Sequence, residues 1–176
     1  AKQANPSLEI KILVDWHRAQ RGRIGAAANS TNADWYYDVA QQYPEIDIPV
    51  YGIPVNTREA LGVLHLKGFL FDNTLLYSGA SINDVYLQRH EKYRYDRYQL
   101  IKNEQLTASM KAFIDDTLLK ADAVQLLNIA NRPKTAEFKN IIKQFRLTLR
   151  GGSYHFVGNA SNHELAVTPL VGLGKK

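Results

Sequence analysis

Residues 64–83, LHLKGFLFDNTLLYSGASIN, contain two β-type runs separated by the pair Asp72-Asn73. Aspartate and asparagine are favoured in tight turns, so this pair predicts a β-hairpin between the runs GVLHLKGFLF and TLLYSGA. The leucines and phenylalanines of both runs satisfy the packing needs of such a hairpin. The polar residues set among them therefore need a separate explanation.

Other strands and one helix are expected on either side of this hairpin. EIKILVDW (9–16) alternates apolar and polar residues and predicts a strand with a buried face. IDIPVYGIPV (46–55) predicts a short strand that its prolines restrict to an edge or a bend. YRYDRYQLI (93–101) predicts another strand. Asn32 is expected to cap a helix that Pro44 ends.

The second half of the chain has a helical pattern. Apolar residues recur at helical spacing over 104–120 and 134–149, with Asn131-Arg132-Pro133 between them and Gly151-Gly152 closing the second helix. Strands and helices followed by a helical pair predict an α/β fold with a helical appendage. We expect both helices to pack on the domain, with membrane contact by one of them as the alternative.

The composition favours an anionic partner. The 176 residues carry a net charge of +5, with a pI near 9.3, which suits nucleic acid, a phosphorylated ligand or an acidic membrane surface. The absence of cysteine excludes disulfides and cysteine-ligated metals. No apolar run approaches the roughly 20 residues of a membrane-spanning helix.

The polar residues of the hairpin region suggest phosphate chemistry. In a strand, His65 and Lys67 would share a face, about 7 Å apart. A lysine there can neutralise a phosphate oxygen while a histidine attacks phosphorus or moves a proton. Gly79 permits close approach of backbone amides, and Asn83 can donate to a phosphate oxygen. Asp72, at the expected turn, is assigned an anchoring role before a chemical one.

These five residues resemble the HKD motif of the phospholipase D superfamily, H-x-K-x4-D-x6-G-S-x-x-N. Ala80 departs from it, since serine is usual there, and Ser81 is next door but out of register. The superfamily tends to place an acidic residue on the following strand to orient the histidine. Asp96 is the candidate and Glu91 the second choice, with a plain surface carboxylate as the alternative for either.

Longer stretches resemble the phospholipase D-like phosphatidylserine synthases of Gram-negative bacteria, and the likeness covers essentially the whole chain. They are VDWHRAQRGRIGAAA, VNTREALGVLH, YSGASINDVYL, HEKYRYDRY, NRPKTAEFKN and LAVTPLVGLGK. The resemblance implies a mixed β-sheet flanked by helices, forming half of a pseudo-symmetric two-domain enzyme. It also implies that CDP-diacylglycerol and L-serine give phosphatidylserine and CMP through a phosphohistidine, without metal or other cofactor. His65 would be the nucleophile, Lys67 and Asn83 the phosphate binders, and Asp96 the orienter.

The resemblance further implies a location and a second half. The enzyme would be cytoplasmic and peripherally attached to an acidic phospholipid surface at the inner membrane. Superfamily members use two HKD motifs and this chain has one, so we expect a fragment: a first HKD domain over 1–103 lacking its N-terminal part, a helical segment over 104–152, and a truncated second half over 153–176. We expect no synthase activity from it alone. A homo-oligomer of single-motif chains could complete a site, but the helical segment argues against that simple arrangement.

Other features of the sequence are compatible with more than one function. His17, Arg18, Arg21 and Arg23 could contact the nucleotide or a lipid headgroup, or form a solvated basic loop. Other superfamily chemistry (cardiolipin synthase-like transfer, lipid hydrolysis or a nuclease) would use the same motif. Arginines and tyrosines interleaved over 86–98 also suit a nucleic-acid-binding module. A catalytically dead interaction domain is a third possibility.

Overall fold

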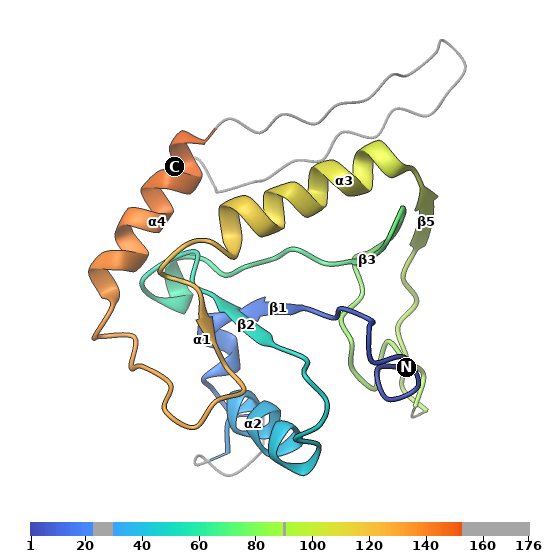
Figure 1. Cartoon of the computed structure of the whole chain (residues 1–176), viewed down its shortest axis with the longest axis horizontal. Coiled ribbons are helices and arrows are strands. Elements are labelled where there is room, and N and C mark those ends of the chain that lie inside the picture. The colour runs from blue at the N-terminus through green and yellow to red at the C-terminus, as the bar shows by residue number, and fades with distance from the viewer. Residues whose placement is uncertain (23–29, 90, 153–176) are drawn as a thin grey trace. The chain divides into compact units, whose positions relative to one another are not determined.

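The computed structural model describes residues 1–22, 30–89 and 91–152 (Figure 1). These residues fall into two compact units. The first unit comprises 1–65 and 117–152, and the described part of the second comprises 66–116. Each unit combines a small sheet with helices, so the expected mixed α/β class is confirmed. The three-part division at residues 103 and 152 stays a prediction.

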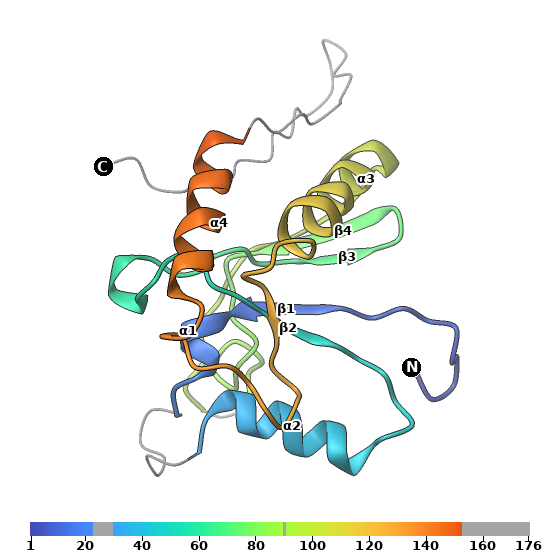
Figure 2. The same cartoon turned by 60° about the vertical axis from the view of Figure 1, so that its left-hand side comes forward.

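The sheet of the first unit has the order β1-β2-β6. Strand β1 (Ile12–Asp15) runs parallel to β2 (Val50–Ile53), beside which it lies in Figure 2, and β6 (Gln125–Leu126) joins β2 antiparallel. The expectation that β2 would be an edge strand or a bend is wrong. Its prolines, Pro49 and Pro54, flank the four-residue strand, so every residue within it keeps its backbone N–H.

Trp16 fills the centre of the first unit and is 0% exposed. Its Nε1 donates to Oγ1 of Thr135 at 2.9 Å, and its ring meets Phe138 edge-on, with centroids 5.2 Å apart. A Cβ added at Gly52 would lie 2.6 Å from Cε3 of Trp16 and 3.1 Å from the side chain of Leu127. The absence of a side chain at Gly52 is therefore what lets the indole approach β2 this closely.

Three helices complete the first unit. Helix α1 (Trp16–Ala19) follows β1 directly, α2 (Asn32–Gln42) stops before Pro44 as expected, and α4 (Lys139–Gly151) ends at the C-cap Gly152 as expected. Helix α4 starts later than the pattern indicated, since residues 135 and 138 contact Trp16 before the helix begins. A single turn of 3-10 helix, η1, covers Glu59–Leu61.

The cap of α2 differs from expectation by one residue. Thr31, not Asn32, is the N-cap, and it forms a reciprocal capping box with Asp34. Arg132 pairs with the Asp34 carboxylate and donates to three carbonyl oxygens, those of Ala33, Leu127 and Ile129. The break between the two expected helices is thereby attached to the start of α2.

The second unit contains an antiparallel sheet of order β3-β4-β5. The predicted hairpin is confirmed: β3 (Phe69–Phe71) pairs with β4 (Thr74–Ser78) across Asp72-Asn73, and Asp72 takes a left-handed φ of 47°. Strand β5 (Tyr98–Lys102) pairs with β4 and leads through Asn103 into helix α3 (Glu104–Ala112), which continues as a π-helical turn, η2 (Phe113–Leu118).

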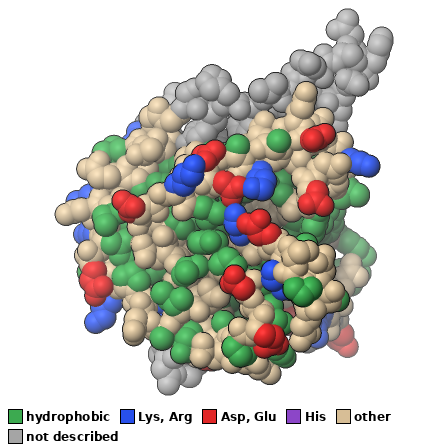
Figure 3. Space-filling view, viewed as in Figure 1, with side chains coloured by type: hydrophobic (Ala, Val, Ile, Leu, Met, Phe, Trp, Pro, Cys, Tyr) green, Lys and Arg blue, Asp and Glu red, His purple; other side chains and the backbone are tan. Residues whose placement is uncertain are grey.

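Two of the strands in this unit are shorter than expected. Residues 62–68 form no strand, because Gly62 and Gly68 both adopt φ of 140°. Strand β5 begins at Tyr98, five residues after the alternation begins. The register places Phe69, Leu76 and Leu100 in one cross-strand row, and Leu100 is 72% exposed. On the face shown in Figure 3, basic and acidic side chains are interspersed among hydrophobic ones.

Candidate active site

Lys67 is held at the end of strand β4. Its Nζ donates to the backbone oxygen of Gly79 and lies 3.4 Å from Oγ of Ser81. The backbone N–H of Ala80 donates to Oγ of buried Ser78 at 3.0 Å, which fixes the turn that carries these acceptors. The second unit thus presents an ammonium group on a backbone loop just past a strand end, an arrangement suited to binding an anion.

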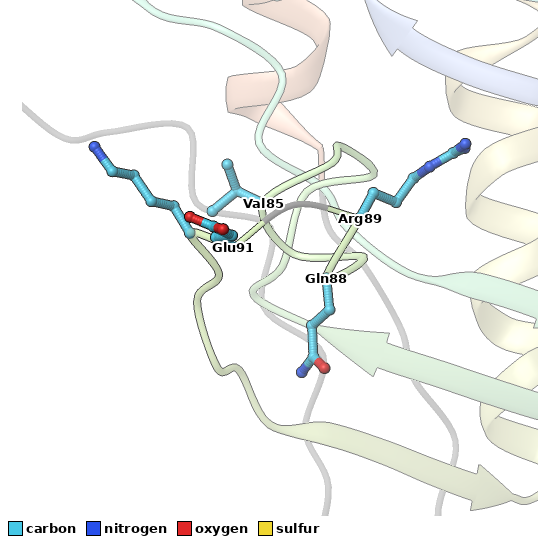
Figure 4. Close-up of a pocket in the computed structure, with 5 residues that line it drawn as sticks. Val85, Gln88, Arg89 and Glu91 are labelled. Carbon is cyan, nitrogen blue, oxygen red and sulfur yellow. The ribbon is translucent and has the colours of Figure 1, made fainter.

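Asp96 lies against the same loop. A Cβ at Gly79 would be 3.1 Å from Oδ2 and 3.3 Å from Oδ1 of Asp96, so the absence of a side chain at Gly79 leaves room for the carboxylate. Oδ1 also accepts from the backbone N–H of Arg97 at 2.7 Å. Glu91 is placed differently: it lines an open pocket with Val85, Gln88, Arg89 and Lys92 (Figure 4). Of the two candidate carboxylates, the structure brings Asp96 to Gly79.

Asn83 and Asp72 have different surroundings. Asn83 accepts from the backbone N–H of Tyr86 through Oδ1 at 3.2 Å, which directs its amide within the loop after Ser81. Asp72 lies at the hairpin turn, at the opposite end of β4 from Gly79, a separation of about 17 Å for five strand residues. The structure therefore does not bring Asp72 to Lys67, and its anchoring role stays a prediction.

His65 is an exposed side chain at the end of the first unit, whereas Lys67 belongs to the second. The reason given for placing the two side chains on one face is wrong, because residues 62–68 form no strand. The catalytic role of His65 stays a prediction. The structure shows how Leu64, the residue before His65, is held by a hydrogen bond within the first unit.

The basic residues near the start of the chain contact their own protein. Nε2 of His17 is 2.7 Å from the backbone oxygen of Asn56. Arg18 and Arg21 both reach Oε1 of Glu59, at 3.4 and 3.3 Å, with about half of each arginine side chain still exposed. Arg23 lies outside the described residues. Contact of this group with a nucleotide or a headgroup stays a prediction.

Sequence reasoning missed Asp15. Its side chain is 7% exposed, caps α1 by accepting from Arg18 N at 2.8 Å, and accepts from Leu64 N at 2.6 Å. An aspartate at the end of a buried strand, directly before a helix start, is the local signal of an N-cap and could have revealed the first bond. The second bond spans 49 residues and has no local signal.

Two further features are absent from the described residues. In these parts of the chain no group of three or more His, Cys, Asp or Glu side chains is placed to hold a metal ion. Likewise, no helix among the residues described has the length and apolarity needed to cross a membrane.

The chain is similar to curated proteins of one activity. It is 58% identical over 99% of its length to the CDP-diacylglycerol–serine O-phosphatidyltransferase of Escherichia coli K12. The Haemophilus influenzae protein of the same name is 51% identical over 98% of the chain. The crystal structure of phosphatidylserine synthase from H. influenzae superposes on 89% of the chain with a TM-score of 0.81 and 52% identity, covering 35% of that protein's chain.

Other comparisons set the limits of this likeness. The chain spans 39% of the length of each of these two curated relatives. A chicken mitochondrial CDP-diacylglycerol–glycerol-3-phosphate 3-phosphatidyltransferase is 30% identical over 57% of the chain and 19% of its own length. No protein-family model matches the chain.

Proposed function

From 58% identity to a CDP-diacylglycerol–serine O-phosphatidyltransferase over 99% of the chain, we infer that the chain belongs to this family, and we propose that it contributes half of the active site of such an enzyme. The reaction is transfer of a phosphatidyl group from CDP-diacylglycerol to L-serine, giving phosphatidylserine and CMP. The similarity to two enzymes that carry this name is the observation on which the proposal rests.

The geometry of the second unit supports a phosphate site. The Lys67 ammonium is anchored on the backbone oxygen of Gly79, at the loop that follows β4. A fixed cation can stabilise the charge that develops on the phosphoryl oxygens as phosphorus is attacked. Asn83, on the loop that follows, supplies an amide as a further donor.

The proposed chemistry is a double displacement in which His65 is the nucleophile. An imidazole nitrogen of His65 attacks the phosphorus that bears the diacylglycerol, the bond from this phosphorus to the CMP oxygen breaks, and CMP leaves. The serine hydroxyl then attacks the phosphohistidine, the P–N bond breaks, and phosphatidylserine is released with His65 restored. Asp96 would orient His65, as the HKD resemblance implies. A proton donor for CMP, and an acceptor for the serine hydroxyl proton, must come from a second motif.

That second motif is part of the proposal. The chain contains a single H-x-K-x4-D sequence, so a second HKD half, from the same polypeptide or from a second copy, would complete the site. The donor lipid is embedded in a bilayer, so the enzyme must work at a membrane surface. The net charge of +5 supports attraction to acidic phospholipids, consistent with peripheral attachment to the cytoplasmic face of the inner membrane.

Transfer to a different acceptor is the second candidate function. The chicken relative is named for transfer from CDP-diacylglycerol to glycerol 3-phosphate, and it matches over 57% of the chain. The two functions share the donor and differ in the acceptor, so they are separated by supplying serine or glycerol 3-phosphate as the only acceptor. The higher identity and fuller coverage of the serine enzymes favour serine.

The test uses the full-length protein and CDP-diacylglycerol labelled in the phosphate next to diacylglycerol. Wild type, His65→Ala and the control His155→Ala are quenched after brief mixing and examined for label on the protein. His155 lacks a lysine two residues later, so its removal should leave the label in place. We expect acid-labile label in wild type and control, none in His65→Ala, and phosphatidylserine only when serine is added. Label that persists in His65→Ala would assign the nucleophile to another residue.

A further inference from the structure

The carboxylate of Asp15 connects two segments of the first unit that are far apart in sequence. Asp15 ends β1 and is paired in register with Ile53 of β2, so its backbone is fixed by the sheet. Its Oδ1 accepts from Arg18 N at 2.8 Å, and its Oδ2 accepts from Leu64 N at 2.6 Å. Both oxygens therefore have a backbone donor, as a carboxylate that is only 7% exposed requires.

Leu64 is the residue immediately before His65. A hydrogen bond to its backbone N–H fixes the peptide between Val63 and Leu64, and the Cα of His65 lies one trans peptide, about 3.8 Å, beyond the Cα of Leu64. Residues 62–68 form no strand, so no sheet hydrogen bonds position this stretch. The Asp15 carboxylate accepts the hydrogen bond from Leu64 N–H that a backbone carbonyl of a neighbouring strand would accept in a sheet.

Earlier residues of the segment 56–64, which leads to His65, are held by residues at the corner where β1 passes into α1. His17 contacts the backbone oxygen of Asn56, and Nδ2 of Asn56 donates to the backbone oxygen of Leu61 at 2.7 Å. Arg18 pairs with Glu59 in the 3-10 turn. Residues 56–64 are thus attached to the β1–α1 corner at the start, in the middle and at the end. The last of these attachments, at Leu64, is the one next to His65.

We infer that Asp15 is a positioning residue: it sets the place and direction of His65 through the backbone of Leu64, and so determines the rate of phosphatidyl transfer without binding the substrate. The inference rests on the proposed role of His65 as nucleophile. A nucleophile must meet phosphorus in line with the leaving oxygen, and a displacement of about 1 Å can reduce the rate about 100-fold. Loss of the Leu64 bond should therefore reduce kcat far more than it changes KM.

Asp15→Asn removes this bond selectively. Asparagine caps helices about as well as aspartate, so its oxygen can keep the bond from Arg18 N. Its NH2 group then faces the N–H of Leu64, donor against donor. Asp15→Ser also keeps a cap, but its hydroxyl is too short to serve both amides. Asp34→Asn is the matched control, because Asp34 forms the capping box of α2 with Thr31 and pairs with Arg132, and none of these described contacts involves residues 56–65.

The experiment measures kcat, KM for CDP-diacylglycerol, and the single-turnover rate of protein labelling in the full-length enzyme, below the thermal midpoint of each variant. We expect kcat and the labelling rate of Asp15→Asn and Asp15→Ser to fall about 10- to 100-fold, with KM within about twofold of wild type. Asp34→Asn should lower the thermal midpoint and leave both kinetic constants within about twofold.

Three results would overturn the inference. They are a kcat of Asp15→Asn within twofold of wild type, an equal loss in Asp34→Asn, and failure of both Asp15 variants to fold, which would make the carboxylate a requirement of the fold itself. These are distinct from failure of the proposed function, which appears in the unsubstituted protein as the absence of label or as label that survives His65→Ala. That failure would overturn the positioning role with it.

Discussion

The contact between Gly52 and Trp16 allows the stability of the first unit to be tested by adding one methyl group. In Gly52→Ala the new Cβ would lie 2.6 Å from Cε3 of Trp16, about 1 Å inside the optimal carbon–carbon distance. The indole cannot retreat freely, because it is 0% exposed, is hydrogen-bonded to Thr135 and meets the ring of Phe138.

Two effects of opposite sign set the expected magnitude. Overpacking of this kind costs about 1–3 kcal/mol. Replacing glycine by alanine in a strand recovers about 0.4–1 kcal/mol by restricting the unfolded chain. We therefore expect Gly52→Ala to lower the free energy of unfolding by about 1–2 kcal/mol. Gly151→Ala in α4 is the control: its Cβ would meet nothing within 4 Å, so that variant should be as stable as wild type or more stable.

Urea unfolding of the full-length protein, followed by tryptophan fluorescence, gives the two free energies. Trp16→Phe removes the six-membered ring that carries Cε3, so in combination with Gly52→Ala it should relieve the overlap. The double variant should then lose about 1 kcal/mol less than the sum of the two single losses. Additive losses, or a Gly52→Ala protein as stable as wild type, would refute the close packing of Trp16 on β2.

Three further predictions concern charge and hydrogen bonding. Lys67→Gln should lower kcat/KM about 100- to 1,000-fold, because the fixed cation at Gly79 is lost. The control Lys102→Gln, on the exposed strand β5, should change kcat/KM less than about twofold. Initial rates of CMP release measure both variants. Ser81→Ala should lower kcat/KM about 2- to 10-fold through loss of one hydrogen bond of ordinary strength, and an unchanged rate would assign no role to the hydroxyl beside Ala80. Hydrogen bonds from the side chain and backbone of Thr31 lower the pKa of Asp34 in the folded protein. The ionised Asp34 carboxylate therefore stabilises the fold above the pKa of the unfolded chain, about 3.9, and this stabilisation is lost as the pH falls through the pKa of the folded protein. The stability difference between wild type and Asp34→Asn, from urea midpoints, should therefore be larger at pH 7 than below pH about 3.5; a constant difference would contradict this.

Features with a local cause were predicted well from the sequence. The hairpin turn at Asp72-Asn73, the helix end before Pro44 and the C-cap at Gly152 each depend on residues within one turn of the feature. The strand expected from residue 62 was overestimated, because a β-type run of residues does not reveal that Gly62 and Gly68 take φ of 140°, and the strand expected from residue 93 begins only at Tyr98.

Features that depend on distant pairing could not be predicted. Nothing in Gln125-Leu126 indicates a strand, since its two residues are fixed by pairing with β2 from more than 70 positions away. At the candidate site, the motif spacing selected Lys67 and Gly79, and the strand expected over 93–101 favoured Asp96 over Glu91. The approach of Asp96 to Gly79 depends on the fold of the loop between β4 and β5.

The two parts of the first unit are separated in sequence by residues 66–116 of the second unit, which determines when the sheet of the first unit can be completed during synthesis. Its sheet is completed only by β6, and its central tryptophan only by residues 135 and 138, whereas residues 66–116 form the described part of another unit. Roughly 70 residues separate β2 from β6, so at about 5–20 residues per second the ribosome needs about 4–14 s to deliver the closing strand. The β3–β4 hairpin, whose contacts are local, can form within microseconds of its release. The β3–β4 hairpin can thus form while β1 and β2 are still an incomplete pair, exposed to chaperones and to aggregation until β6 is made.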